Sequence, residues 1–379
     1  MVIVLIALFM ALILVGISIM SKLSYAHNHF KMKKLITARS LVDDLPSVSV
    51  CIPARNEMHA LTACLENVIA SRYPKLEIIV LDDSSADKTS VLIKSFASAG
   101  VRFVEGSPLP VGWLGKNHAL QGLLEEASGS YILFVDVDTQ IGPDTIEELV
   151  AYARQENAEM VSVLPRREDG WRLSVIFSPL RYFWELVLHS HHSPATASNA
   201  WMIKRSVLTD EFDGFTPFKE AIQPEAQYSS RLMARNAYRF LIGTPLIAVS
   251  YEKKWQSQVD TSVRLSFPLI GGRVWRATLG CIGLLILLSP VVTLIGALYT
   301  IFSALHWLAL STYLLYTAVY AMYLSQVWRK AWWLAAFLWP LTVLQELVIL
   351  IVSTGRYLTK SVTWKNRPVT TTDVHLRAR

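Results

Sequence analysis

The stretch "YILFVDVDT" (Tyr131–Thr139) joins a run of apolar residues to two aspartates that stand one residue apart, Asp136 and Asp138. Because side chains alternate along a β-strand, both carboxylates are predicted to leave the sheet on the same face. Adjacent carboxylates repel, and burying either one without a partner is costly, so a positive group is expected between them. Mg²⁺ and Mn²⁺ prefer oxygen ligands and would meet that demand. The alternative is a solvated turn in which an aspartate caps a helix.

From Pro46 onward, short apolar segments alternate with amphipathic ones. The predicted strands are Val48–Ala54, Leu76–Asp83, Val101–Gly106, Tyr131–Asp138 and Glu159–Pro165. The predicted helices are Glu57–Ser71, Ser85–Gly100, Lys116–Ala127 and Gly142–Gln155, the last with Pro143 in its first turn. This alternation is typical of an α/β fold with a mostly parallel sheet covered by helices. In such sheets ligands bind beyond the carboxyl ends of the strands, where the polar residues of this segment fall.

The two ends of the chain are more apolar than a soluble domain requires. The composition is 52% hydrophobic, Met1–Met20 carries no charge, and long apolar runs return after Leu279. About 20 apolar residues suffice to span a bilayer. The first run has no basic segment before it and is followed by basic residues, namely Lys22, Lys31, Lys33, Lys34 and Arg39. This order favours an uncleaved anchor with a cytoplasmic flank over a cleaved signal peptide.

Other binding chemistries find no support in the sequence. The 3 cysteines, Cys51, Cys64 and Cys281, form neither a disulfide framework nor a zinc pattern. The net charge of +6 suits basic residues that flank membrane segments and meet anionic lipid head groups. No cluster of basic and aromatic residues argues for nucleic acid as a partner.

Four segments, in this order and spacing, resemble those of glycosyltransferase family two: "VSVCIPARNE", "IIVLDDSSAD", "GWLGKNHALQ" and "YILFVDVDT". Two further segments, "PVGWLGKNHAL" (Pro110–Leu120) and "VTWKNRP" (Val362–Pro368), look most like the membrane-bound carotenoid and hopanoid branch of that family. The resemblance implies the GT-A nucleotide-sugar fold. It also implies a metal-dependent, inverting transfer of a sugar from a nucleotide diphosphate sugar, with UDP-glucose as the expected donor, to a lipid in the membrane.

The resemblance also implies roles for the residues that match the family's motifs. The implied donor-binding residues are Pro53, Ala54, Asn56, Glu57, Asp83, Lys116 and Asp136. The first four would line the nucleotide pocket, Asp83 would hold the base or ribose, and Lys116 would lie near the nucleotide or its diphosphate. Asp136 would face the ribose and the metal, and Asp138 would bind the Mn²⁺ or Mg²⁺ that neutralises the leaving diphosphate. For each of these residues the alternative is an ordinary role in a turn.

The general base of the family is usually the Asp of a Glu-Asp pair that opens a helix. Here the corresponding stretch is Ile222–Phe240, and aligning Asn236 with the family's terminating Gly puts Glu225 in the position of the base. A register shifted by one residue would place Ala226 there and leave no base. Pro224 suits an early helix position and Asn suits a left-handed cap, so Glu225 is the expected catalytic residue. Its alternative role is that of a partner for the helix dipole.

The expected organisation is an N-terminal transmembrane anchor (1–21), a basic linker (22–45), a cytosolic GT-A catalytic domain (46–260), an interfacial segment (261–278), two or three transmembrane helices (279–353) and a basic tail (354–379). Three C-terminal spans would place the tail opposite the catalytic domain, whereas its Lys and Arg residues favour the cytoplasm. If the tail lies in the cytoplasm, Ala331–Ser353 would be re-entrant or interfacial and would not span the membrane. This segment contains Pro340, Gln345 and Glu346. The sequence leaves the number of spans open.

The expected acceptor is a carotenoid or terpenoid that carries a carboxylate or a hydroxyl group. A carboxylate is already ionised at neutral pH, so its glycosylation tolerates an altered base site better than that of a hydroxyl. One alternative function is a processive polysaccharide synthase, although "GGRVW" (Gly271–Trp275) lacks the Gln of the Q-x-x-R-W motif of such enzymes. Another alternative is a non-catalytic membrane scaffold, which the departure at Pro224-Glu225-Ala226 would suit.

Overall fold

The computed structural model describes residues 2–32, 45–167, 178–299, 303–328, 332–365 and 367–368. Lys33, Lys34, Arg39 and the end of the basic tail (369–379) lie outside the described residues. The chain divides into two compact units. The sheet unit comprises residues 30–166, 189–252 and 363–379, and the helical unit comprises residues 1–29, 167–188 and 253–362.

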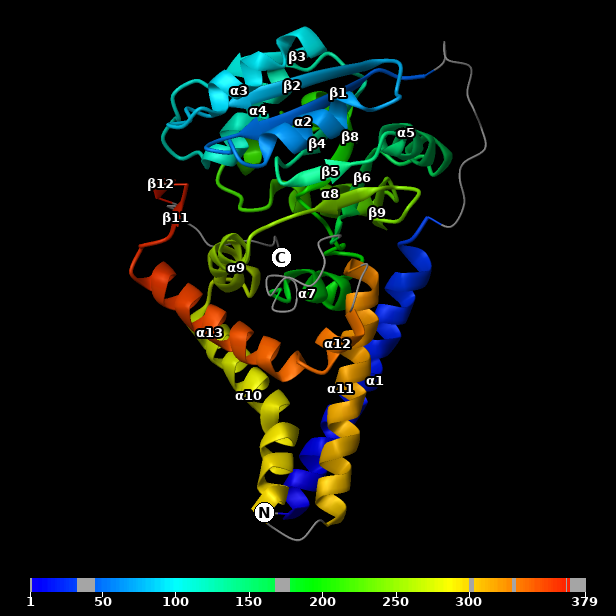
Figure 1. Cartoon of the computed structure of the whole chain (residues 1–379), viewed down its shortest axis with the longest axis vertical. Helices are drawn as coiled ribbons and strands as arrows, with labels where there is room; N and C mark the ends of the chain where they lie inside the picture. Colours follow the sequence, from blue (N-terminus) through cyan, green and yellow to red (C-terminus); the bar gives the residue numbers. More distant parts are fainter. Residues whose placement is uncertain are drawn as a thin grey trace. The chain divides into compact units, whose positions relative to one another are not determined.

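The sheet unit is built on a mixed, mostly parallel sheet (Figure 1). In the described part of the chain its strands are β1 (Val48–Ala54), β2 (Leu76–Asp82), β3 (Val101–Glu105), β4 (Tyr131–Val135), β6 (Met160–Leu164), β8 (Ala200–Lys204) and β9 (Tyr238–Ile242). Their spatial order is β3-β2-β1-β4-β8-β6-β9. β8 is antiparallel to β4 and β6, and the other neighbouring strands are parallel. The predicted α/β architecture is therefore confirmed.

Helices cover this sheet, and a cluster of buried apolar residues joins its strands to three of them, over residues 61–69, 89–95 and 145–155. The helices of the sheet unit are α2 (Leu61–Ile69), α3 (Thr89–Ser95), α4 (Gly115–Glu126), α5 (Thr145–Gln155) and α8 (Pro224–Met233). α2 buries Leu61, Leu65 and Val68, which share one face at helical spacing. Each such side chain contributes about 1.5–3 kcal/mol when fully buried. α4 approaches β2 closely at Gly122, where a Cβ would lie 2.8 Å from Leu81 Cδ1.

Several predicted boundaries differ in the structure, among them the end of β4 and the starts of α2 and α5. β4 ends at Val135, three residues earlier than expected, because the chain turns at Asp136 and the amide of Thr139 donates to the carbonyl of Asp136 at 2.9 Å. α2 begins at Leu61, so Glu57 lies in the preceding loop. α5 begins at Thr145, so Pro143 lies before the helix rather than in its first turn.

Smaller strands extend the sheet unit. β5 (Thr139–Ile141) pairs antiparallel with β10 (Val249–Tyr251), and β7 (Arg166–Arg167) completes this second sheet. Near the C-terminus, β11 (Thr363–Trp364) and β12 (Arg367–Pro368) form an antiparallel hairpin that also belongs to the sheet unit. The last residues described are thus part of the same unit as β1 to β4.

The helical unit contains α1 (Val2–His29), α7 (Arg181–Leu188), α9 (Trp255–Leu269), α10 (Val274–Gly296), α11 (Ala304–Val327), α12 (Trp332–Ala336) and α13 (Trp339–Leu358). Among the described residues, 4 helices are long and apolar enough to cross a membrane: α1, α10, α11 and α13. The apolar segments predicted at both ends of the chain are therefore helices. α1 and α11 pack together, with Tyr316 Oη donating to the carbonyl of Leu12 at 3.0 Å.

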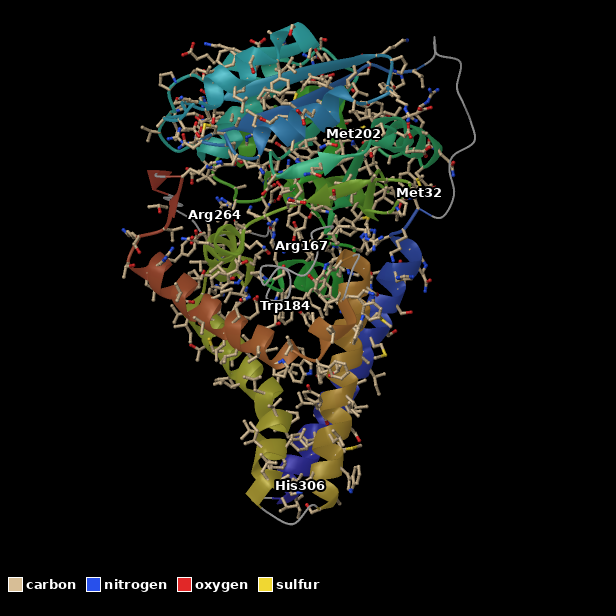
Figure 2. All side chains as sticks on the ribbon, in the orientation of Figure 1. Met32, Arg167, Trp184, Met202, Arg264 and His306 are labelled. Carbon is tan, nitrogen blue, oxygen red and sulfur yellow. The ribbon has the colours of Figure 1, made fainter. Side chains whose placement is uncertain are left out.

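α13 differs from the other three long helices in its surroundings. It packs along α9, where the amide of Phe267 donates to Ser353 Oγ at 3.0 Å. Its Glu346 Oε1 accepts the amide of Leu180, just before α7, at 2.7 Å. In Figure 1, α1, α10 and α11 reach the far end of this unit, which His306 marks in Figure 2, whereas α13 stays beside α9 and α7.

Candidate active site

Two loops interlock at the carboxyl ends of β1 and β2. The amide of Asn56 donates to Ser85 Oγ at 2.9 Å, and Asn56 Oδ1 accepts the amide of Ala86 at 2.8 Å. The amide of Asp83 donates to the carbonyl of Ala54 at 2.8 Å. Asn56 and Ser84 both adopt positive φ, 51° and 53°, a conformation that costs energy outside glycine and is most common for Asn and Asp. The loops that carry the predicted donor residues are thus held in one defined conformation.

Arg55 holds Asp83 in place at the carboxyl ends of β1 and β2. This arginine was not among the residues predicted from the sequence. Asp83 is only 3% exposed, and its carboxylate lies 3.9 Å from Arg55 Nη1. The same guanidinium nitrogen donates to the backbone carbonyls of Asp83 and of Ser84, the latter at 3.1 Å. A buried carboxylate needs such a counter-charge. The signal was present in "PARNE", where an arginine stands among the residues that end β1.

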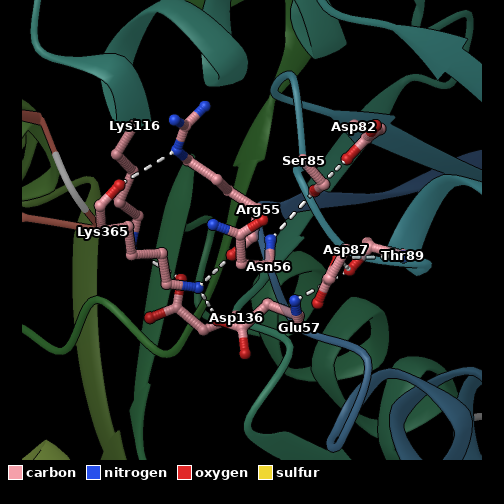
Figure 3. A network of polar contacts seen from close by, with 10 residues as sticks. All are labelled: Arg55, Asn56, Glu57, Asp82, Ser85, Asp87, Thr89, Lys116, Asp136 and Lys365. Carbon is pink, nitrogen blue, oxygen red and sulfur yellow. Dashed lines mark hydrogen bonds and ion pairs between the residues drawn. The ribbon is translucent and has the colours of Figure 1, made fainter.

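The aspartates after β4 lie in a turn, and Lys116 supplies a positive charge to one of them. The side chain of Lys116, in the first turn of α4, forms an ion pair with Asp136 Oδ1 at 2.6 Å (Figure 3). Val137 is 4% exposed and belongs to the core, while the aspartates on either side of it are half-buried. The predicted alternation therefore holds within the turn, although the strand itself has already ended.

Three carboxylates act electrostatically on the buried thiol of Cys64. Burial is the largest cause of the rise of its pKa to about 12, and the negative charges of Asp138, Asp136 and Glu57 contribute to the same rise in that order. Cys64 lies on the buried face of α2. β1 and β4 are neighbouring parallel strands, so the loop that holds Glu57 and the turn that holds Asp136 and Asp138 follow strand ends at the same edge of the sheet.

The side chains at this edge of the sheet could supply only some of the ligands that a divalent cation needs. Among the described residues, no group of three or more His, Cys, Asp or Glu side chains is placed to hold a metal. Mg²⁺ is usually held by one or two carboxylates, with phosphate oxygens and water completing its shell. Asp136 and Asp138 offer such a pair of hard oxygen donors. They therefore suit an ion that arrives with a diphosphate.

In the helix that carries Glu225, Pro224 and Asn236 take the positions predicted from their backbone preferences. α8 begins at Pro224, and Asn236 adopts the expected left-handed conformation with φ of 59°. The amide of Asn236 donates to the carbonyl of Met233 at 3.0 Å, and that of Ala237 donates to the carbonyl of Leu232 at 2.9 Å. This pair of bonds is a Schellman cap. Glu225 consequently lies in the first turn of α8.

Glu225 is buried, with 2% of its surface exposed. Tyr228 lies one turn later in the same helix. Burial raises the pKa of its phenol, and the negative charge of Glu225 also contributes to this rise. The phenol donates to the carbonyl of Gly214 at 2.7 Å. Glu225 therefore stands near the segment 214–223 that leads into α8, whereas the donor residues form their own network at β1, β2 and β4.

Asn117 is a second residue that sequence reasoning passed over, although it directly follows Lys116 in "GWLGKNHALQ". It is 1% exposed, and its Nδ2 donates to three successive backbone carbonyls, those of Phe218 at 2.9 Å, Lys219 at 3.1 Å and Ala221 at 2.7 Å. It thereby fixes the loop before α8 to the first turn of α4. α4 thus presents Lys116 to Asp136 and also holds the loop that leads into the helix of Glu225.

Comparison with known proteins agrees with this geometry. Residues 49–210 match the model of the family described as Glycosyl transferase family 2. The resemblance inferred from the four motifs is therefore confirmed. The match covers β1 through β8 and includes the donor loops, Lys116 and both aspartates.

Two curated relatives resemble this region. The undecaprenyl-phosphate 4-deoxy-4-formamido-L-arabinose transferase of Pectobacterium carotovorum is 30% identical over 133 residues, which are 34% of this chain and 40% of that protein. The 4,4'-diaponeurosporenoate glycosyltransferase of Staphylococcus aureus is 30% identical over 138 residues, 36% of each chain. The matched region thus spans well under half of these relatives' length.

One solved structure supports the fold of the whole chain. The mannosyltransferase PcManGT of Pyrobaculum calidifontis, in complex with GDP-Man and Mn²⁺, superposes with a TM-score of 0.56 at 18% sequence identity. The superposition covers 93% of this chain and 99% of that one. The expected GT-A fold with apolar helices is therefore confirmed.

Proposed function

We propose that the protein is an inverting, metal-dependent glycosyltransferase that moves a sugar from a nucleotide diphosphate sugar, UDP-glucose in the first place, to a lipid acceptor in the membrane. The observation that carries this proposal is the Lys116–Asp136 pair beside Asp138, at the carboxyl edge of a sheet in the region that matches the glycosyltransferase family 2 model. The long apolar helices supply the membrane association that a lipid acceptor requires.

The donor would lie across the ends of β1, β2 and β4. Asp83, held by Arg55, would accept hydrogen bonds from the base or ribose, and the loop at Asn56 would line the nucleotide. Lys116 and the amino end of α4 would place positive charge at the diphosphate, because a helix N-terminus favours anions. A Mn²⁺ or Mg²⁺ ion on Asp138 and Asp136 would neutralise the leaving diphosphate.

The acceptor proposed is a carotenoid or another terpenoid that carries a carboxylate or a hydroxyl. Both curated relatives are named for lipid acceptors, and one of those acceptors, 4,4'-diaponeurosporenoate, is a carboxylate. Glu225 would take the proton from a hydroxyl acceptor at the moment of attack. With a carboxylate acceptor no proton has to be removed, so Glu225 would serve only to shape the site.

We propose further that the protein crosses the membrane three times, with the sheet unit in the cytoplasm. The C-terminal hairpin belongs to the sheet unit, since Lys365 contacts Arg55 and Glu57. An even number of crossings must therefore separate Glu252 from Thr363. α10 and α11 supply two, and α13, with Glu346 bonded to the amide before α7, would lie in the interface.

The distribution of charge supports this topology. The link between α10 and α11, residues 297–303, contains no Lys or Arg. At the opposite ends of these helices, Arg273 precedes α10 and Arg276 lies in its first turn, and Arg329 and Lys330 follow α11 in the sequence. By the positive-inside rule, the link lies outside and the basic ends lie in the cytoplasm.

The two competing functions have less support. A non-catalytic scaffold has no need for Asp83, Asp136 and Asp138, yet Arg55 and Lys116 hold two of these in place. A processive synthase would release long polymers, which separate from a single-sugar product on a gel.

The direct test uses the full chain in detergent with UDP-glucose, Mn²⁺ and a lipid extract, followed by mass spectrometry of the lipids. The expected result is one lipid whose mass increases by a single hexose. Lack of any sugar transfer or donor hydrolysis, with GDP-mannose as well as UDP-glucose, would contradict the proposal.

A further inference from the structure

The hairpin of β11 and β12 carries Lys365 at its tip. Thr363 pairs with Pro368 and Trp364 pairs with Arg367, so Lys365 lies in the turn between the strands. Its φ is 46°, in the left-handed region. An L-residue adopts this conformation at an energetic cost, so local contacts must hold it there.

Those contacts join the tip to the loop after β1. Lys365 Nζ forms an ion pair with the carboxylate of Glu57 and donates to the carbonyl of Arg55 at 2.5 Å. The carbonyl of Lys365 accepts a hydrogen bond from Arg55 Nε at 3.4 Å. Figure 3 shows this ammonium group directed into the network that contains Asn56 and Glu57. A residue from the end of the chain thus reaches the donor loop.

Two lysine–carboxylate pairs border the same neighbourhood. Lys116 pairs with Asp136, and Lys365 pairs with Glu57. The charges of both acids act on the thiol of Cys64, together with that of Asp138. The two ammonium groups each pair with a carboxylate at the carboxyl edge of the sheet, one carried by α4 and one by the C-terminal hairpin.

Both pairs are exposed enough to exchange partners. The side chains of Lys365 and Glu57 are 24% and 29% exposed, and those of Lys116 and Asp136 are 26% and 27% exposed. Ion pairs in contact with water are weak, because the solvent competes for both charges. A diphosphate offers several charged oxygens, and lysine is a common phosphate-binding residue. A cation bound to the aspartates would add to the attraction for the phosphates.

We propose that Lys365 is a binding residue for the diphosphate of the donor, delivered by the C-terminal hairpin and held ready by Glu57. When the donor enters, the ammonium group exchanges the carboxylate of Glu57 for phosphate oxygens. This inference rests on the proposed function, because it requires a nucleotide diphosphate in the site. It assigns to the chain's last described segment a direct part in donor recognition.

The test measures binding of UDP and of uridine to the full chain in detergent, by calorimetry and by saturation-transfer NMR. Lys365→Ala is expected to weaken UDP binding about tenfold or more, the effect of losing a charge-assisted hydrogen bond. Uridine, which has no phosphate, is expected to bind Lys365→Ala and wild type equally. Lys365→Arg is expected to restore most of the affinity for UDP. A hairpin that only supported the loop would affect both ligands alike.

Lys360→Ala is the matched control. Lys360 is an exposed lysine of the same C-terminal region, and it also adopts positive φ, 52° against 46° for Lys365, but it follows α13 in the helical unit. Its removal is expected to leave the affinity for UDP unchanged. An equal loss in both variants would overturn the proposal by showing a general effect of basic charge.

A second variant covers the case in which Lys365→Ala is poorly folded. Lys365→Gln keeps a side chain that can donate to the carbonyl of Arg55 but removes the positive charge, so it is expected to weaken UDP binding as Lys365→Ala does. Affinity for UDP equal to that of wild type in a folded Lys365→Gln variant would overturn the proposal. If wild type binds UDP but Lys365→Ala binds it equally well, only this inference fails. If wild type binds no UDP, the proposed donor fails and this inference fails with it.

Discussion

The ammonium group of Lys116 lies 2.6 Å from Asp136 Oδ1, and this pair joins the first turn of α4 to the turn that follows β4. The two residues are separated by 20 positions in the sequence. α4 is fixed to the sheet by its close approach at Gly122 and to the loop before α8 by Asn117. α4 therefore presents a positive charge to the aspartate turn and also holds the loop before α8 through Asn117.

Replacing Lys116 should reduce catalysis much more than stability. Lys116→Ala is expected to lower kcat/KM for the donor about 100-fold, the usual effect of removing one preorganised electrostatic group. The pair is about one quarter exposed, so its loss should cost only about 1 kcal/mol of stability or less. Initial rates and thermal unfolding of the same samples would measure both effects.

The control for Lys116 is an ion pair near the other end of α4. Arg102 Nη1 lies 3.1 Å from Glu126 Oε2, and both side chains are nearly half exposed. Arg102→Ala is expected to leave kcat/KM unchanged. A rate for Lys116→Ala close to that of wild type would show that the lysine has only a structural role.

Manganese should bind tightly only when the nucleotide is present. The described residues supply no three-ligand metal group, so the ion needs phosphate oxygens to complete its shell. The signal of free Mn²⁺ in electron paramagnetic resonance is expected to fall on adding protein with UDP, and to fall little with protein alone. Asp138→Asn should abolish the UDP-dependent loss of signal.

Asp144→Asn is the control for the manganese experiment. Asp144 is exposed and forms an ion pair with Arg72 at 3.0 Å. Its variant should bind Mn²⁺ with UDP as wild type does. Tight Mn²⁺ binding by Asp138→Asn would remove this aspartate from the metal site.

Substitution of Glu225 should distinguish the two kinds of acceptor. Glu225→Gln preserves the shape of the buried side chain but cannot accept a proton. With a hydroxyl acceptor the rate is expected to fall about 10²–10⁴-fold, the usual contribution of a general base. With a carboxylate acceptor the rate should barely change, because that acceptor is already ionised. Rates with a paired alcohol and acid of the same terpenoid would decide, and a large loss with the acid would restore a catalytic role for Glu225 there.

Removing Arg55 should destabilise the sheet unit. Arg55→Ala would leave Asp83 buried without its counter-charge, and we expect a loss of about 3 kcal/mol. Arg55→Ala with Asp83→Asn should recover part of that stability, because no buried charge remains. Unfolding by urea, followed for each variant, measures the coupling between the two residues. Equal stability of Arg55→Ala and wild type would show that solvent compensates for the guanidinium.

The proposed topology predicts which parts of the helical unit are accessible from outside the cell. In a Cys281→Ser background, a membrane-impermeant maleimide should label Leu298→Cys, in the link between α10 and α11, in intact cells. Lys360→Cys, after α13, should react only after the membrane is permeabilised. Labelling of Lys360→Cys in intact cells would mean that α13 crosses the membrane and that the tail lies outside.

Local patterns in the sequence determined much of the fold. β1 occupies Val48–Ala54 as predicted, because its residues are apolar on both faces and the following loop is polar. The helix around Glu225 was placed correctly, because Pro224 and Asn236 mark its ends through their own backbone preferences. The motifs also indicated the resemblance to glycosyltransferase family 2, and residues 49–210 match the model of that family.

Only the tertiary structure decided how the charges of the site are paired. The turn at Asp136 depends on a hydrogen bond from its amide to the carbonyl of Asn199, a residue of another part of the chain. Arg55 forms a hydrogen bond with Asp83, 28 residues away in the sequence, and Lys365 forms one with Arg55, 310 residues away. Hydrophobic periodicity and backbone preference act over a few residues, so the helices and strands that depend on them can be predicted from the sequence. The pairing of side chains from distant segments depends instead on where the sheet and its loops bring them together.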